Sequence, residues 1–475
     1  MDHAVTGRPM KSVAQTKALA NATPARGPTA QVRHHLQAAG PVAAMMVVYI
    51  LVTVGRIQDI VPGLHVLPVA KIVAALAIII ALQNRPTLAS TSIWSLRPAK
   101  YTIVFMVLVV VSMTFSILKH ATFGTIKGTA LSVCVSLVLL IKSARNWKDV
   151  RRLLMACVLA SLVLAFSAEI TSFAGRAGYT HDLDPNDFAF VMDALLPFSV
   201  TFALVSRRFK RLCYIGVSLW LVLEILHTES RGGLLGLACI ITMLIVLLPG
   251  KRRGQLLPKA SKAMIASRII TIIMAASIAW HVIPNSARVR FETLGHPDSG
   301  YNANLNDPTG RFSIWLQTLP LSVDRPWGWG AGAFNTVDGK YGGGRYKAAH
   351  NMYLQALIEL GFEGLALFLA ALLSSVGCLK SEAFAMPEPT DQDGLERRAF
   401  ARAMIASFTG LCVSGFFLAE LYSQAIWTLI ILSCLVGSSA LTQNEVHPGT
   451  KGRASRPTQN PLPDGVRNAP QHARS

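Results

Sequence analysis

The chain has 475 residues, of which 52% are hydrophobic and 15% are charged, and its formal net charge at pH 7 is +20. Apolar runs this long and this numerous exclude a soluble globular protein and indicate a polytopic membrane protein. The basic residues are dispersed over short loops, where they face anionic lipid, so the positive charge does not predict binding to nucleic acid.

Both ends of the chain are polar. Residues 1–38 are rich in Ala, Pro and Thr, and residues 443–475 are rich in Pro, Gly, Asn and Arg, so we expect two disordered tails. The membrane domain lies between them, over residues 39–442. Windows of about 20 residues with few charges predict an all-α helical bundle of about twelve transmembrane helices, centred in 40–55, 64–82, 101–118, 124–141, 153–173, 187–205, 212–228, 232–250, 268–283, 362–379, 400–419 and 422–441.

Lys and Arg residues are concentrated in every second loop of this arrangement. The positive-inside rule then predicts that both termini lie in the cytoplasm. The basic loops assigned to the inner side contain Arg85, Arg97, Lys142, Arg145, Arg207, Arg208, Lys251, Arg252, Arg397 and Arg398. All seven cysteines lie in or at the ends of predicted spans, which argues against a disulfide framework and a cysteine-based metal site.

One large hydrophilic segment, about 284–350, is expected on the outer side of the membrane and contains amphipathic helices. The first helix is predicted to begin at an N-cap, Thr309, and its apolar face then carries Phe312, Trp315, Leu316 and Leu319 at helical spacing, so it can lie on the membrane surface.

A glycine-rich turn with two indoles, Trp327 and Trp329, follows this helix. Such indoles are suited to the membrane interface or to stacking on sugar rings, and we favour the interface.

Helical periodicity resumes at Asn351 and continues to about Leu379, which is longer than one membrane crossing. Glu359 lies in its first half, and a carboxylate near the bilayer centre costs about 2.5–3.5 kcal/mol on insertion scales. Gly361 and Gly364 lie beside Glu359, so we expect an extramembrane helix, a glycine joint and a span that starts at about Phe362.

His350 stands where the large loop re-enters the membrane, and three arginines, Arg231, Arg311 and Arg176, are assigned to the same side. A neutral imidazole can accept a proton, and guanidinium groups grip phosphate oxygens in pairs. The alternative is that His350 is a capping or surface residue, that Arg231 pairs with Glu229 and that Arg311 pairs with Asp307. Arginines and an imidazole together favour a site for a phosphate-bearing ligand at the interface.

Four segments resemble, in order, the signatures of the O-antigen ligase and polysaccharide polymerase superfamily. The resemblance covers roughly residues 170–375 and includes Arg176 and the Asp184-Pro185-Asn186 turn. The four segments are Thr228–Leu235, Gly310–Trp315, Arg325–Gly330, and His350–Gln355 followed by Glu359-Leu360-Gly361.

The resemblance implies a metal-independent, inverting glycosyltransferase without a cofactor, located in the bacterial inner membrane and acting at its periplasmic face. Its donor would be a glycan on undecaprenyl pyrophosphate, and its acceptor a glycan or the lipid A core. His350 would be the general base, and Arg231, Arg311 and Arg176 would bind the pyrophosphate, with supporting positions at Asn351, Tyr353, Glu229 and Asn186. A chain-length regulator or a flippase would be a partner.

Three further interpretations stay open beside an exopolysaccharide or O-antigen polymerase. A ligase would use the same chemistry on a different acceptor. A transporter or flippase of lipid-linked oligosaccharides would fit the hydropathy, although transporters usually show internal repeats. A metal-dependent enzyme would use Asp182, Asp184 and Asp187 as ligands, but Asp-Pro-Asn more naturally forms a turn before a helix.

Overall fold

In the computed structural model the chain divides into two units, residues 1–40 and residues 41–475. Most of the second unit is described. The residues that the structure describes are 40–61, 63–64, 67–85, 88–171, 183–252, 255–257, 259–282, 285–292 and 310–438. Arg176, Asp182 and both predicted tails, residues 1–38 and 443–475, lie outside these ranges.

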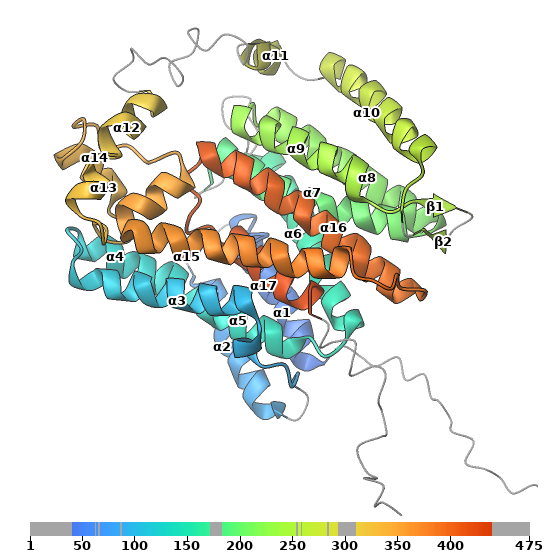
Figure 1. Cartoon of the computed structure of the whole chain (residues 1–475), viewed down its shortest axis with the longest axis horizontal. Helices are drawn as coiled ribbons and strands as arrows, with labels where there is room; N and C mark the ends of the chain where they lie inside the picture. The colour runs from blue at the N-terminus through green and yellow to red at the C-terminus, as the bar shows by residue number, and fades with distance from the viewer. Residues whose placement is uncertain are drawn as a thin grey trace, which may run out of the picture. The chain divides into compact units, whose positions relative to one another are not determined.

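The first half of the described chain is helical. Its elements are α1 (Pro41–Thr53), η1 (Ile57–Asp59), α2 (Val69–Gln83), η4 (Ile93–Ser95), α3 (Arg97–Val111), η5 (Ser112–Thr114), α4 (Lys119–Thr125), the π-helical turn η6 (Ile126–Ala130), α5 (Leu131–Ser143), α6 (Trp147–Thr171), α7 (Pro185–Val205), α8 (Arg208–His227) and α9 (Arg231–Leu247) (Figure 1).

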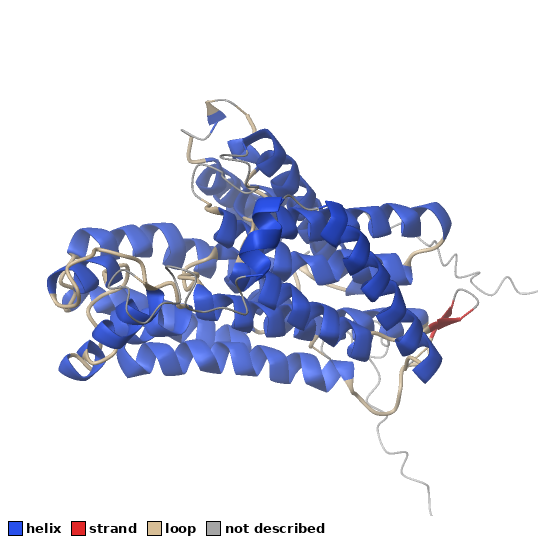
Figure 2. Ribbon diagram, turned by 90° about the horizontal axis from the view of Figure 1, so that it is seen from above, coloured by secondary structure: helices blue, strands red, loops and turns tan. Residues whose placement is uncertain are grey.

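The second half adds a short antiparallel strand pair, which is red in Figure 2, and further helices. Its elements are β1 (Lys251–Arg252), β2 (Gln255–Leu256), α10 (Lys262–Val282), α11 (Asn285–Glu292), α12 (Arg311–Thr318), α13 (Leu321–Asp324), α14 (Phe334–Lys340), α15 (Met352–Ala383), α16 (Gln392–Ser414), η9 (Gly415–Phe417) and α17 (Gln424–Val436).

Each of the twelve predicted windows contains a helix of the structure. Within the described residues, six helical segments are long and apolar enough to cross a membrane, and four shorter apolar helices accompany them. The chain is therefore a mostly helical, multi-pass membrane protein. The six long segments are Arg97–Thr114, Lys119–Ser143, Trp147–Ile170, Pro185–Val205, Met352–Ala383 and Gln392–Phe417.

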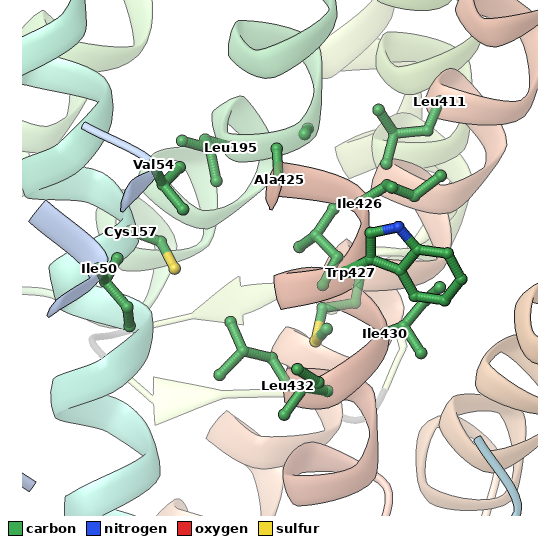
Figure 3. Packing of buried hydrophobic residues seen from close by; sticks show 14 of the residues in the cluster. Ile50, Val54, Cys157, Leu195, Leu411, Ala425, Ile426, Trp427, Ile430 and Leu432 are labelled. Carbon is green, nitrogen blue, oxygen red and sulfur yellow. The ribbon is translucent and has the colours of Figure 1, made fainter. Parts of the chain in front are cut away.

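The centre of the bundle is built around α17, although this helix has only 13 residues. Trp427 is fully buried, and its ring centroid lies 4.9 Å from that of Phe105 on α3. Apolar side chains of this kind bury the largest areas and bring distant helices together. Figure 3 shows side chains from α1, α6, α7, α16 and α17 in this cluster, among them Ile50, Cys157, Leu195, Leu411, Ile426 and Leu432.

The joint predicted in the long helix is confirmed at Gly361. Its φ of 72° and ψ of −170° interrupt α15, which splits into residues 352–360 and a longer helix from Phe362. The glycine-rich turn packs into this break, because Phe362 N donates to Pro326 O at 2.9 Å and Trp329 N donates to Ile358 O at 2.9 Å. A Cβ at position 361 would lie 2.1 Å from Pro326 O, so only glycine fits there.

Glu359 is fixed beside the joint by four donors. Its carboxylate accepts hydrogen bonds from Gly332 N (2.7 Å), Phe334 N (3.3 Å), Tyr422 Oη (2.7 Å) and Gln355 Nε2 (3.4 Å). The carboxylate therefore fastens the loop segment that precedes α15 to the long helix and to the chain ahead of α17.

Two predictions about the large loop need correction. The N-cap of α12 is Gly310 and not Thr309, so no side chain caps this helix. Trp329 is only 4% exposed and donates its indole N–H to Leu321 O at 3.0 Å, which removes it from the membrane interface. Trp327, in contrast, is 54% exposed, as an interfacial residue would be.

The apolar face predicted for α12 points outward. Leu316 and Leu319 are 64% and 50% exposed, whereas Ile314 and Thr318 on the opposite face are buried in the loop's own small core. An outward apolar face on a helix between membrane spans is the arrangement of an interfacial helix.

Candidate active site

His350 lies directly before α15 and adopts a left-handed backbone conformation, with φ 44°. A non-glycine residue in this region costs of order 1–3 kcal/mol, and such strain concentrates at functional sites. The next residue, Asn351, is the N-cap of α15, and its side chain accepts from Tyr353 N at 2.9 Å and Leu354 N at 3.0 Å. The cap fixes the direction of the chain immediately after the imidazole.

Helix α12, which carries Arg311, is attached to the residue that precedes His350. Trp315, one turn after Arg311, donates its indole N–H to Ala349 O at 2.8 Å. This bond joins α12 to the residue before His350, across 34 positions of the chain. Arg311 and His350, which are distant in sequence, are thus held on adjacent elements.

A series of packed aromatic rings extends from Trp315 to the N-terminus of α9. Trp315 packs edge-on against Phe416, with centroids 5.3 Å apart, and Phe416 packs against Phe417 at 5.5 Å. Phe417 in turn lies against Gly232, where a Cβ would be only 3.2 Å from the Phe417 Cβ. Arg231 precedes this glycine as the first residue of α9.

The start of α9 has the features of an anion site. Ser230 is its N-cap and accepts from Gly233 N at 3.1 Å, and Gly233 packs so closely on Ala189 of α7 that a Cβ would be 2.6 Å away. The free N–H groups and dipole of a helix N-terminus attract anions, and a neighbouring guanidinium adds a permanent charge. Glu229, just ahead, is buried and also left-handed, with φ 54°.

Acidic side chains complete the surroundings of His350. Asp184 is the N-cap of α7, accepting from Asn186 N at 2.6 Å and Asp187 N at 3.0 Å, and its charge acts on the imidazole. Asp187 completes the capping box and is hydrogen-bonded to Glu420. Burial beside these carboxylates raises the pKa of Glu420 well above its ordinary value.

The electrostatics keep the imidazole neutral. Burial is the main cause, and the positive charges of Arg311 and Lys347 add to it, while Asp184 opposes them; together they lower the pKa of His350 from 6.5 to about 4. At neutral pH the side chain has an open acceptor nitrogen and is a base and not an acid.

Most of the predicted site residues are therefore brought to one end of the bundle. His350, Arg311, Arg231 and Asn186 lie there, and Arg176 lies outside the described residues. Asn351 acts as a helix cap, and the Tyr353 hydroxyl donates to Cys412 O at 3.0 Å, so both support the site through the backbone.

Sequence reasoning missed the pairing of Asp187 with Glu420 and the proximity of Asp184 to His350. Glu420 lies between η9 and α17, and a carboxylate in a short interhelical turn would have been the signal. Asp184 and Asp187, two of the three ligands that a metal-dependent enzyme would need, form the capping box of α7 with their carboxylates.

Comparison with known proteins agrees with the motifs. Residues 216–369 match the sequence model of a family described as O-antigen ligase, and the segment includes Arg231, Arg311 and His350. No curated protein matches the chain. The matched segment lies in the mostly helical membrane bundle, and this part of the chain is similar to the O-antigen ligase family.

Proposed function

We propose that this protein is an inner-membrane polysaccharide polymerase that transfers a glycan from undecaprenyl pyrophosphate to a sugar hydroxyl at the periplasmic face. The observation that carries the proposal is that His350 is close enough to Arg311 and Asp184 to be affected by both charges, at the end of the bundle where α9 starts with Arg231. The membrane location fits a donor whose lipid tail remains in the bilayer.

The arginines would stabilise the leaving group. As the bond between the anomeric carbon and the pyrophosphate oxygen breaks, that oxygen accumulates negative charge. Arg231 at the N-terminus of α9 and Arg311 in the first turn of α12 provide fixed positive charge there, which is worth more in the transition state than in the ground state. Arg176 is proposed as a third guanidinium on sequence grounds alone.

His350 would act as the general base. It takes the proton of the acceptor hydroxyl while the hydroxyl oxygen attacks the anomeric carbon from the face opposite the pyrophosphate, so the configuration inverts. Undecaprenyl pyrophosphate departs with the bonding electron pair. A pKa of about 4 makes a weak base, but bound pyrophosphate offsets the charge of Arg311 and raises the basicity of the imidazole once the donor is in place.

An O-antigen ligase, which transfers the glycan to the lipid A core, is the second candidate and would use the same groups. We favour the polymerase because a large loop with the exposed indole of Trp327 suits an extended sugar chain. A chain-length regulator or a flippase of the same pathway is the expected partner.

Glycan transfer by the purified protein in detergent tests the proposal. The donor would be a lipid-linked repeat unit, and products would be separated by size with and without EDTA. We expect longer chains to form in both conditions from the repeat unit alone. A ligase would require added lipid A core, a metal-dependent enzyme would stop in EDTA, and a transporter would form no new glycosidic bond.

A further inference from the structure

Three metal-binding side chains lie together where α6 and α8 end. Glu169 comes from the last turn of α6, and Glu224 and His227 come from the last turn of α8. One ligand atom from each of the three lies within 4.8 Å of the others. Glu224 and His227 are three positions apart, so they share one face of their helix.

The Glu224 carboxylate is incompletely satisfied. The residue is fully buried, and its Oε1 accepts the indole N–H of Trp220 at 2.8 Å. Its other oxygen, Oε2, is buried and meets no N–H or hydroxyl donor in the part of the chain that the structure describes, and the carboxyl group interacts instead with that of Glu169. A buried carboxylate oxygen without a donor is unfavourable, and a second carboxylate beside it adds repulsion. Both effects are removed by a cation bound between the two groups.

The donor set selects the type of cation. One imidazole nitrogen with two carboxylate oxygens suits zinc and similar divalent transition metals, whereas Mg²⁺ and Ca²⁺ prefer oxygen ligands alone. Zinc binds such atoms at about 2.0–2.2 Å in a tetrahedral arrangement, so the ligand atoms would close to about 3.4 Å from one another when the ion binds. Glu169 is exposed and leaves a route for the ion and for a water ligand.

We propose that Glu169, Glu224 and His227 form a structural site for a divalent transition-metal ion that clamps the end of α6 to the end of α8. His227 is followed after three residues by Arg231, so the clamp also fixes the chain that leads into α9. The site is separate from the residues assigned to glycan transfer, and the inference does not rest on the proposed function.

The test is Zn²⁺ binding by the full-length protein, purified in detergent and freed of metal with a chelator. A calorimetric titration gives the affinity, and the melting temperature with and without Zn²⁺ gives a second readout. We expect one site whose occupation raises the melting temperature, as ligand binding to the folded state requires. Glu224→Gln and His227→Ala should each weaken that site by at least about tenfold and abolish the rise.

Matched controls separate this site from other zinc-binding groups. His281→Ala and Glu292→Gln remove an exposed imidazole and an exposed carboxylate elsewhere, and both should bind Zn²⁺ like the unmodified protein. Glu169→Gln changes an exposed ligand and leaves the core intact. If this variant fails to bind Zn²⁺, unfolding cannot be the reason. Equal affinity in the unmodified protein and in all three ligand variants, or no binding at all, would overturn the proposal.

Discussion

The pH dependence of transfer tests the environment found for His350. Burial and the charges of Arg311 and Lys347 lower its pKa to about 4, about 2.5 pH units below the ordinary value of 6.5. At pH 5.5 an ordinary histidine is only about one-tenth neutral, whereas a group with a pKa of about 4 stays almost entirely neutral. Between pH 7.5 and 5.5, kcat/KM should therefore change by no more than about 10%. If His350 had the pKa of an ordinary histidine, kcat/KM would fall about tenfold over the same range.

The assay is kcat/KM for the lipid-linked donor from pH 4 to 8, since this constant reports the free enzyme. Arg311→Gln removes one positive charge, so the pKa of His350 should rise but stay below 6.5, because burial is the larger cause. The acid limb of this variant should move to higher pH, whatever its overall rate. An acid limb near pH 6.5 in the unmodified protein would refute the reasoning.

Three further substitutions give distinct outcomes. Gly361→Ala should lower the melting temperature by several degrees, because the positive φ alone costs of order 1–3 kcal/mol and the new Cβ would lie 2.1 Å from Pro326 O. The control Gly377→Ala, where a Cβ meets nothing within 4 Å, should be neutral or stabilising. Equal effects of the two substitutions would contradict the account of the joint. Arg231→Ala should abolish product at normal protein levels and Arg231→Lys should restore only part of it, since an ammonium lacks the paired donors; identical yields from both variants would count against phosphate binding. Trp315→Phe removes the hydrogen bond to Ala349 O, which should cost about 1 kcal/mol and lower kcat more than it changes KM; an unchanged kcat would show that this bond does not position His350.

The helices and the joint could be predicted because they follow from local patterns. Apolar runs locate the helices, and the cost of placing Glu359 in a membrane located the break at Gly361. The same argument did not reveal what Glu359 does, because its donors Gly332 and Tyr422 are far away in the chain.

What could not be predicted depends on contacts between distant segments. Trp329 has the sequence context of an interfacial indole, yet the turn folds back onto α15 and buries it. The pair of Asp187 and Glu420 and the bond from Trp315 to Ala349 also join segments without a shared local motif. The order of motifs along the chain identified His350, Arg231 and Arg311, but only the folded chain supplied their surroundings.

The rate of glycan transfer by the His350→Ala protein is the most direct test of the central claim. His120→Ala, which removes an exposed imidazole on α4, is the control. We expect His350→Ala to accumulate in the membrane normally and to lose about 10²–10⁴-fold in rate, as removal of a general base does, while His120→Ala transfers glycan normally. Transfer at the unmodified rate by His350→Ala would contradict the assignment of this histidine and with it the proposed mechanism.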